Sequence, residues 1–160
     1  MTHSEKEFTH LMEQNRGIVY KVIRLYVNHP EDEQDLFQEI HLQAWRSFER
    51  FNGLSKFSTW LYRVSLNTVL TFKRRAVLVK PAESLEHIGG THEPHTRSDE
   101  SEALYQAIRG LSEIDRMIIT LHLDGYENEE IAEISGLTKN NVAVKLHRIK
   151  ESLTKKLKQY

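Results

Sequence analysis

Side chains that hydrogen-bond well to nucleic acid gather in one stretch near the C-terminus, which runs from Gly136 to Lys150 as GLTKNNVAVKLHRIK. Val142, Leu146 and Ile149 recur there at intervals of four and three, the spacing of one buried side of a helix. Asparagine can pair with adenine in the major groove of DNA, and arginine or lysine can bind guanine or phosphate. The polar side chains expected opposite the apolar side are Lys139, Asn140, Asn141, Lys145 and Arg148.

The residues before this helix complete a helix-turn-helix pattern. A short apolar repeat covers about 128–135, Gly136 stands where a tight turn requires positive φ, and Thr138 can cap the next helix. In a helix-turn-helix the second helix enters the major groove. The sequence therefore predicts a duplex-binding motif. The plainer alternative is a helical hairpin whose lysines serve solubility.

A second group of residues, in the N-terminal half, combines aromatic and charged side chains. Residues 35–75 contain DLFQEIHLQAW, FSTWLYRVSLN and KRR, in that order. Aromatic rings beside cations suit single-stranded nucleic acid, whose unpaired bases can stack on them. Taken alone, Trp45, Phe57 and Trp60 fit a hydrophobic core better than a stacking platform.

Charge is segregated along the chain, although the formal net charge is only −1. Residues 138–160 hold seven lysines and arginines against Glu151 alone, a net of +6, and residues 63–80 hold five with no acid. Acidic residues are instead concentrated in two stretches, 31–39 and 127–133. A basic stripe is the electrostatic footprint of phosphate binding, and a merely solvated face is the alternative.

The elements that must position these side chains are predicted to be helices, because the chain has only three prolines and seven glycines and its apolar residues repeat with a helical period. The first helix is expected to begin after Ser4, with Glu7 completing a capping box, and to run to the Asn-His-Pro stop at 28–30. The second helix is expected to follow this stop and end near Phe51, and the third to span about 58–77.

Residues 80–98, KPAESLEHIGGTHEPHTRS, lack sustained periodicity and are predicted to form a flexible linker. Ser112 is expected to cap one of the helices that follow it. Those helices are expected at about 99–109, 112–123, 128–135 and 138–160. The predicted fold is therefore all-α, with two small helical domains at 1–79 and 99–160 joined by the linker.

Composition excludes several classes of protein. The sequence contains no cysteine, which rules out disulfide frameworks and thiolate metal sites. No apolar run approaches the roughly 20 residues of a membrane span. The N-terminus, MTHSEKEFTH, lacks the apolar core of a secretory signal. A cytoplasmic protein without a membrane span is expected.

Two other functions compete with these patterns. Nine histidines suggest a helical metalloenzyme, but the E-x-x-H motif of Glu7 and His10 occurs once, whereas a di-iron bundle needs two. His87, His92 and His95 lie in the expected linker, where a metal would bind weakly. No catalytic residue, metal or cofactor is therefore predicted. A two-domain transcription regulator would keep the helix-turn-helix but leave the aromatic and basic helix unexplained.

The N-terminal half resembles region 2 of sigma factors in its stretches DLFQEIHLQAW, FSTWLYRVSLN and KRR. Residues 111–153 resemble region 4 of the same family. The order, the size and the single linker are similar to the compact extracytoplasmic-function (ECF) group, which lacks the other sigma regions. The resemblance implies a sigma factor without enzymatic activity. Such a protein binds core RNA polymerase, recognises the −10 and −35 promoter elements and helps to melt the DNA.

The resemblance also implies roles for particular residues. Asp35, Gln38 and Glu39 are expected to dock on the coiled coil of the polymerase β′ subunit. The opened −10 strand is expected to bind the loop 51–57 and the helix after it, where Asn67 helps to read a flipped base. The residues implied for −10 binding are Lys56, Trp60, Arg63, Asn67, Lys73 and Arg74. The polar residues of the helix-turn-helix are expected to read the −35 duplex, in a domain that also contacts the polymerase β flap.

The sequence departs from the family pattern in two places. Ala143 and Val144 follow Val142, where the family often carries a further cation, and the loop 52–56 reads NGLSK, where the family often has a small residue or arginine. Because of both departures, the resemblance does not determine which promoter sequence the chain recognises. The resemblance also leaves open whether an anti-sigma factor binds the chain.

Overall fold

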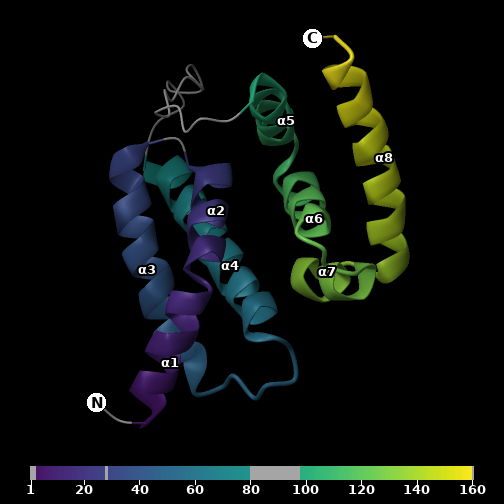
Figure 1. The fold of residues 1–160 in the computed structure, drawn as a ribbon. Helices are drawn as coiled ribbons and strands as arrows, with labels where there is room; N and C mark the ends of the chain where they lie inside the picture. Colours follow the sequence, from purple (N-terminus) through teal and green to yellow (C-terminus); the bar gives the residue numbers. More distant parts are fainter. Residues whose placement is uncertain (1–2, 28, 80–97, 160) are drawn as a thin grey trace. The chain divides into compact units, whose positions relative to one another are not determined.

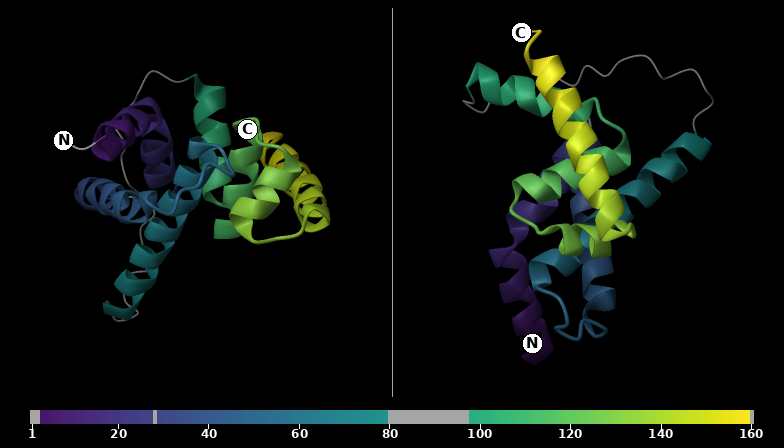
Figure 2. Two further views of the ribbon diagram at one scale, coloured as in Figure 1. Left: turned by 90° about the horizontal axis from the view of Figure 1, so that it is seen from below. Right: turned by 90° about the vertical axis from the view of Figure 1, so that its right-hand side faces the viewer.

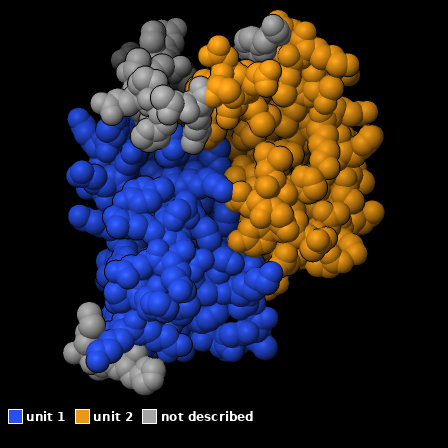
Figure 3. Space-filling view, viewed as in Figure 1, with its two compact units in different colours: residues 1–91 blue, residues 92–160 orange. Residues whose placement is uncertain are grey.

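The computed structural model describes residues 3–27, 29–79 and 98–159, and the regular structure within these ranges is α-helical (Figure 1). Contacts divide the chain into two compact units, Met1–Thr91 and His92–Tyr160 (Figure 3). The predicted all-α class with two small helical domains is thereby confirmed. The expected linker and its three histidines lie outside the described residues, except for Ser98.

The described residues of unit 1 form four helices: α1 (His3–Gln14), α2 (Arg16–Tyr26), α3 (Pro30–Phe48) and α4 (Phe57–Val79). Helices α2 and α3 both pack on α4, and α3 runs beside α4 in the opposite direction (Figure 1). Leu36, Ile40 and Ala44 recur every fourth residue, so α3 buries one continuous stripe against its neighbours. Leu61 and Val69 of α4 are likewise fully buried.

The prediction of one long N-terminal helix was wrong, because the chain breaks at Asn15 between α1 and α2. The Asn15 side chain donates a hydrogen bond to the Leu11 carbonyl over 2.8 Å. The Leu11 carbonyl at the end of α1 thus accepts hydrogen bonds from both the backbone N–H and the side-chain amide of Asn15. Gly17 lowers helix propensity just beyond the break. Ser4 lies inside α1 instead of preceding it, so the expected capping box is also wrong.

Helix α3 ends at Phe48, three residues before the end predicted from the sequence. The chain turns at the expected Asn-Gly pair, where Gly53 adopts a φ of +72° and the Asn52 side chain accepts a hydrogen bond from the Leu54 N–H at 3.1 Å. Pro30 lies at the start of α3, where its missing N–H costs no hydrogen bond. Both ends of α3 are thus set by local backbone chemistry.

Unit 2 contains α5 (Asp99–Arg109), α6 (Glu113–Leu123), α7 (Asn128–Ser135) and α8 (Lys139–Leu157). Helix α8 packs against all three of the others, as Figures 1 and 2 show. Ser112 and Thr138 cap α6 and α8 as predicted, each accepting the N–H of the residue three positions on. Arg116 holds the turn between α5 and α6 by donating to the carbonyls of Arg109 at 2.7 Å and Leu111 at 3.1 Å.

None of the described helices is long and apolar enough to cross a bilayer. Within the same residues, no three histidine, aspartate or glutamate side chains come together as ligands of a metal ion.

Candidate nucleic-acid interfaces

The turn before α8 has the geometry that the sequence predicts. Gly136 adopts a φ of +74°, and its N–H donates to the Ala132 carbonyl at 2.9 Å, which ends α7. Thr138 then accepts the Asn141 N–H at 3.1 Å and starts α8. A left-handed glycine at one helix end and a threonine cap at the next fix the angle between the two helices of a helix-turn-helix.

Helix α8 buries one side and turns a polar side outward. Val142, Leu146 and Ile149 are buried as predicted. At 100° per residue, Asn140, Asn141 and Arg148 point away from that stripe, and all three are exposed. The outward face also carries Val144, which is 43% exposed. This face therefore offers amide and guanidinium groups around one apolar side chain, a set that can contact base edges and a thymine methyl group.

The two lysines predicted for this face differ from these exposed residues. Each lies at an edge of α8 and pairs with an acidic side chain of another helix. Lys145 Nζ lies 3.2 Å from Asp115 Oδ1 of α6, with the two side chains 38% and 29% exposed. Lys139 Nζ pairs with Glu129 Oε1 of α7. The hydrogen bond between them raises the pKa of Lys139 and lowers the pKa of Glu129. Both side chains are more than 60% exposed, so water and salt weaken this pair.

An aromatic cluster in unit 1 fixes the loop between α3 and α4. Trp60 lies 5.2 Å from both Phe51 and Phe57, measured between ring centroids, and Phe48 completes the cluster. Phe57 is buried as expected, and Trp60 is partly covered. Trp45 departs from the expected core position. It is 37% exposed and packs edge-on against Phe8 of α1.

The residues predicted for the −10 strand do not all share one side of α4. Trp60, Arg63, Asn67 and Arg74 follow one another at helical spacing along one stripe. Lys73 lies on a different side, with its Nζ 5.8 Å from the ring centre of Tyr26 in α2. Lys56, which is exposed, precedes α4 in the loop.

A polar hollow of about 810 Å³ lies between α3 and α4. Asn67 lines it, about 15 Å along α4 from Phe57 at the helical rise of 1.5 Å per residue. Asn67 is therefore separated from the aromatic loop with which it was predicted to act. The other residues lining the hollow are Asp35, Glu39, Gln43, Arg46, Ser47, Arg50, Val64, Thr68, Thr71, Phe72 and Arg75.

The three residues predicted for polymerase docking lie on two sides of α3. Asp35 and Glu39 are four residues apart and line the hollow. Gln38 lines a separate, mostly apolar groove between α1 and α3, together with Leu42 and Trp45. Leu42 is 41% exposed, because the stripe of α3 that faces the core is filled by other residues.

Three residues that line the hollow were not among those predicted from the sequence: Gln43, Arg46 and Arg50. Their signal is present in the sequence as a polar series that follows Glu39 at spacings of three and four.

Family models match both units. The model of sigma-70 region 2 matches residues 11–77, and the model of sigma-70 region 4 matches residues 101–153. The match to region 2 accounts for the aromatic and basic helix that a two-domain regulator would leave unexplained.

Two curated relatives align with nearly the whole chain. The ECF RNA polymerase sigma-E factor of Haemophilus influenzae is 32% identical over 170 residues, covering 96% of this chain and 88% of the relative. The ECF RNA polymerase sigma-E factor of Escherichia coli strain K12 is 30% identical over 168 residues, covering 96% and 87%.

Solved structures share the fold. The sigma factor RpoE of Bartonella quintana, in complex with the anti-sigma factor NepR, matches with a TM-score of 0.73 and 22% identity over 96% of both chains. CnrH, in complex with the cytosolic domain of CnrY, matches with a TM-score of 0.70 and 20% identity over 97% of this chain and 90% of CnrH. The chain belongs to the sigma-70 family as a sigma factor of the ECF group, which recognises promoters and initiates transcription with RNA polymerase.

Proposed function

We propose that the two units divide promoter recognition, with unit 2 reading the −35 duplex through α8 and unit 1 holding the opened −10 strand along α4. The outward face of α8 is the observation that carries this proposal. Asn140, Asn141 and Arg148 are exposed there, opposite a buried stripe, as a helix in the major groove requires. Lys139 and Lys145 flank the same face and are proposed to contact phosphates at its edges.

In unit 1, the stripe formed by Trp60, Arg63, Asn67 and Arg74 gives the −10 strand a continuous path. Trp60 at its start offers a partly exposed ring for stacking, and Arg74 offers an exposed cation near its end. Asn67 lies between them and is proposed to read a base. Lys56 and Lys73 are proposed to act from beside the stripe, on the backbone of the DNA.

Polymerase docking is proposed to use Asp35, Gln38 and Glu39 on the first half of α3. Since these residues lie on two sides of the helix, the polymerase surface must reach around α3 from the acids to the groove that Gln38 lines. Exposed Leu42 and Trp45 in that groove supply apolar area for such a contact.

The domains of the chain are proposed as 1–79 and 99–160, with 80–98 as the linker between them. The chain is proposed to act in the cytoplasm without enzymatic activity of its own, because the polymerase performs the chemistry. An anti-sigma factor is proposed as a further partner, since the sigma factor RpoE, which shares this fold, was solved in complex with the anti-sigma factor NepR.

In vitro transcription with core RNA polymerase on genomic fragments tests this function. Adding the chain should produce transcripts that start at a small set of sites, each preceded by common −10 and −35 sequences. The same transcripts from core polymerase alone, or none with the chain present, would show the proposal to be wrong.

A further inference from the structure

One ion pair of unit 2 joins the edge of the outward face of α8 to another helix. Lys145 Nζ lies 3.2 Å from Asp115 Oδ1, and the two residues are 30 positions apart in the sequence. Asp115 lies in the first turn of α6, where its N–H donates to the Ser112 hydroxyl oxygen at 3.2 Å. Lys145 follows Asn141 by one turn of α8. A carboxylate of α6 is therefore placed beside the face that is proposed to enter the major groove.

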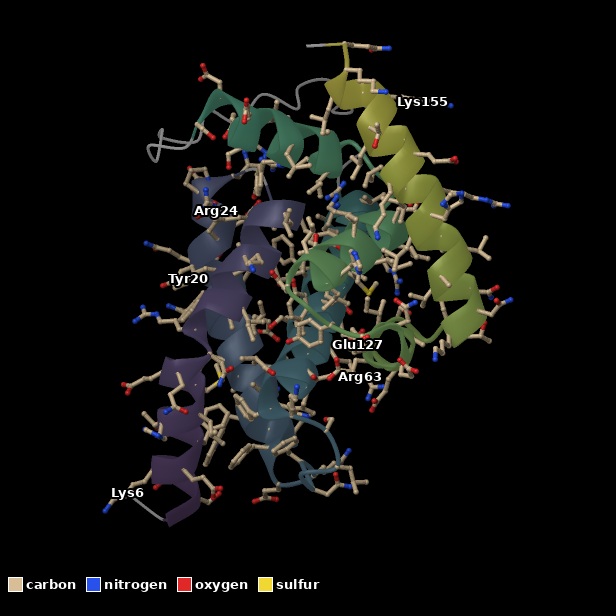
Figure 4. The ribbon with its side chains drawn as sticks, turned by 45° about the vertical axis from the view of Figure 1, so that its right-hand side comes forward. Lys6, Tyr20, Arg24, Arg63, Glu127 and Lys155 are labelled. Atoms are coloured by element: carbon tan, nitrogen blue, oxygen red, sulfur yellow. The ribbon has the colours of Figure 1, made fainter. Side chains whose placement is uncertain are left out.

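Other cations of α8 are not paired in this way. Within the described residues, no carboxylate lies within ion-pair distance of Arg148 or Lys155. Lys155 projects from the far end of α8 into solvent (Figure 4). A lysine on this helix thus needs no acidic partner to be solvated, and the pairing of Lys145 requires another explanation.

Stability explains the pair poorly. The two side chains are 38% and 29% exposed, so water weakens their attraction. Helices α6 and α8 already pack together, and both bury apolar side chains, among them Ile118 and Val142. Glu113 already places an acid in the first turn of α6, where it favours the helix dipole. Asp115 therefore adds little to either effect.

We propose that Asp115 limits the binding of the free chain to DNA of any sequence, because it competes with phosphates for Lys145. This inference rests on the proposed role of unit 2 in binding duplex DNA. A phosphate oxygen bound to Lys145 lies at most roughly 6 Å from Asp115 Oδ1, given a charge-assisted hydrogen bond of about 2.8 Å. Two negative charges at that distance repel each other, so the phosphate either displaces Asp115 or binds less tightly.

The consequence concerns the chain before it joins polymerase. Sequence-independent binding comes from phosphate contacts, so neutralising one cation lowers it for every sequence. A genome offers about 10⁶ to 10⁹ non-specific sites, which retain a free chain more strongly as its affinity for phosphate rises. Asn140 and Asn141 carry no charge, so their contacts with bases are not subject to this competition. Asp115 thereby keeps unit 2 from binding DNA until contacts with bases or polymerase add to the affinity.

The test measures binding of the full chain to a short duplex of random sequence by fluorescence anisotropy, at several salt concentrations. Asp115→Asn leaves Lys145 unpaired and should steepen the slope of log affinity against log salt by up to about 0.9. The variant should bind several-fold more tightly at low salt. This gain should shrink by up to about threefold when salt rises from about 50 to 200 mM.

A double-mutant cycle shows whether the gain acts through Lys145. In a Lys145→Ala chain, Asp115→Asn should change the affinity much less, because the cation that it would leave unpaired is gone. Asp115→Ser removes the same charge and should give the same gain, whereas Asp115→Glu keeps the charge and should bind as weakly as the wild type.

Asp99→Asn is the matched control for net charge. Asp99 is an exposed acid of unit 2, and no described cation lies within ion-pair distance of it. Its replacement changes the net charge by the same amount as Asp115→Asn does. It should therefore give a smaller gain in affinity and a smaller change in slope.

Three results would overturn the inference. One is an unchanged affinity for the random duplex in both uncharged variants of Asp115, including no binding by any of the proteins at low salt. Another is an equal gain from Asp99→Asn, or in the Lys145→Ala chain, since the effect would then come from net charge. The third is a loss of thermal stability that Asp115→Glu reverses, without a change in DNA binding, because the pair would then only hold α6 to α8. Failure of the wild-type chain to direct transcription with core polymerase would instead reject the proposed function itself.

Discussion

The α3–α4 hollow of unit 1 and the outer face of α8 in unit 2 both present cations and asparagines, but they hold their cations differently. In unit 2, Lys139 and Lys145 pair with acids from α7 and α6, so each joins α8 to a neighbouring helix. In unit 1, Arg46 and Arg50 have no acidic partner within the described residues. A high density of positive charge in the sequence therefore does not show which cations are available to DNA.

This difference suggests two kinds of recognition surface. In unit 2, the ion pairs join α8 to its neighbours, and the exposed amides of Asn140 and Asn141 together with Arg148 are proposed to contact DNA. In unit 1, the exposed guanidinium groups of Arg46 and Arg50 remain available to phosphate, which suits a single strand that must be held before it can be read.

The largest effect is expected at Asn141, because it lies on the outward face of α8 and carries no charge. Asn141→Ala should weaken binding to a −35 duplex by about 1–3 kcal/mol if the amide makes a bidentate base contact. Binding to a scrambled duplex should not change. Fluorescence anisotropy with both duplexes measures this difference, and equal weakening of both would make Asn141 a positioning residue.

Gly136 tests whether the turn sets the position of α8. A Cβ added there meets no atom within 4 Å, so the cost of Gly136→Ala comes from the backbone conformation alone. At a φ of +74° that cost is about 1–2 kcal/mol in the free energy of unfolding. Chemical denaturation should show this loss in the transition of unit 2 only. An unchanged midpoint would mean that the turn relaxes without strain.

Much of unit 2 was predictable because its signals are local. Gly136, Thr138 and Ser112 act on residues within one turn of themselves, and the helix ends that they set were predicted to within a residue. The far end of α8 was predicted less well, because the helix ends at Leu157, three residues before the predicted end. The break at Asn15 was missed because the apolar pattern continues on both sides of it. The hollow and the ion pair of Lys145 with Asp115 could not be read from the sequence, since each depends on how two separate helices pack.

Arg148 and Lys145 allow free and paired cations on one helix to be compared. Arg148→Ala should lower the slope of log affinity against log salt by about 0.9 if the guanidinium binds one phosphate. Lys145→Ala should lower it by less, because Asp115 already neutralises part of that charge. Equal changes in the two slopes would show that DNA displaces Asp115 completely.

The smallest effect is expected from removing the ion pair between Lys139 and Glu129. Glu129→Gln should raise affinity for duplex DNA only slightly, because the pair it removes is exposed. Since pairing lowers the pKa of Glu129, the pair persists at neutral pH and is lost only as acid protonates that carboxylate. The gain should therefore be constant between about pH 6 and 8, far from either ordinary pKa. A gain that varies across this range would assign the effect to another group.

The most direct test of whether the two units read separate promoter elements measures two variants, each on two altered promoters. Transcription is measured with core polymerase on a cognate promoter and on versions with either the −10 or the −35 element scrambled. Asn67→Ala should lose its sensitivity to the −10 element and keep that to the −35 element, and Asn141→Ala should show the reverse. If both variants respond equally to both changes, the two units do not read separate elements.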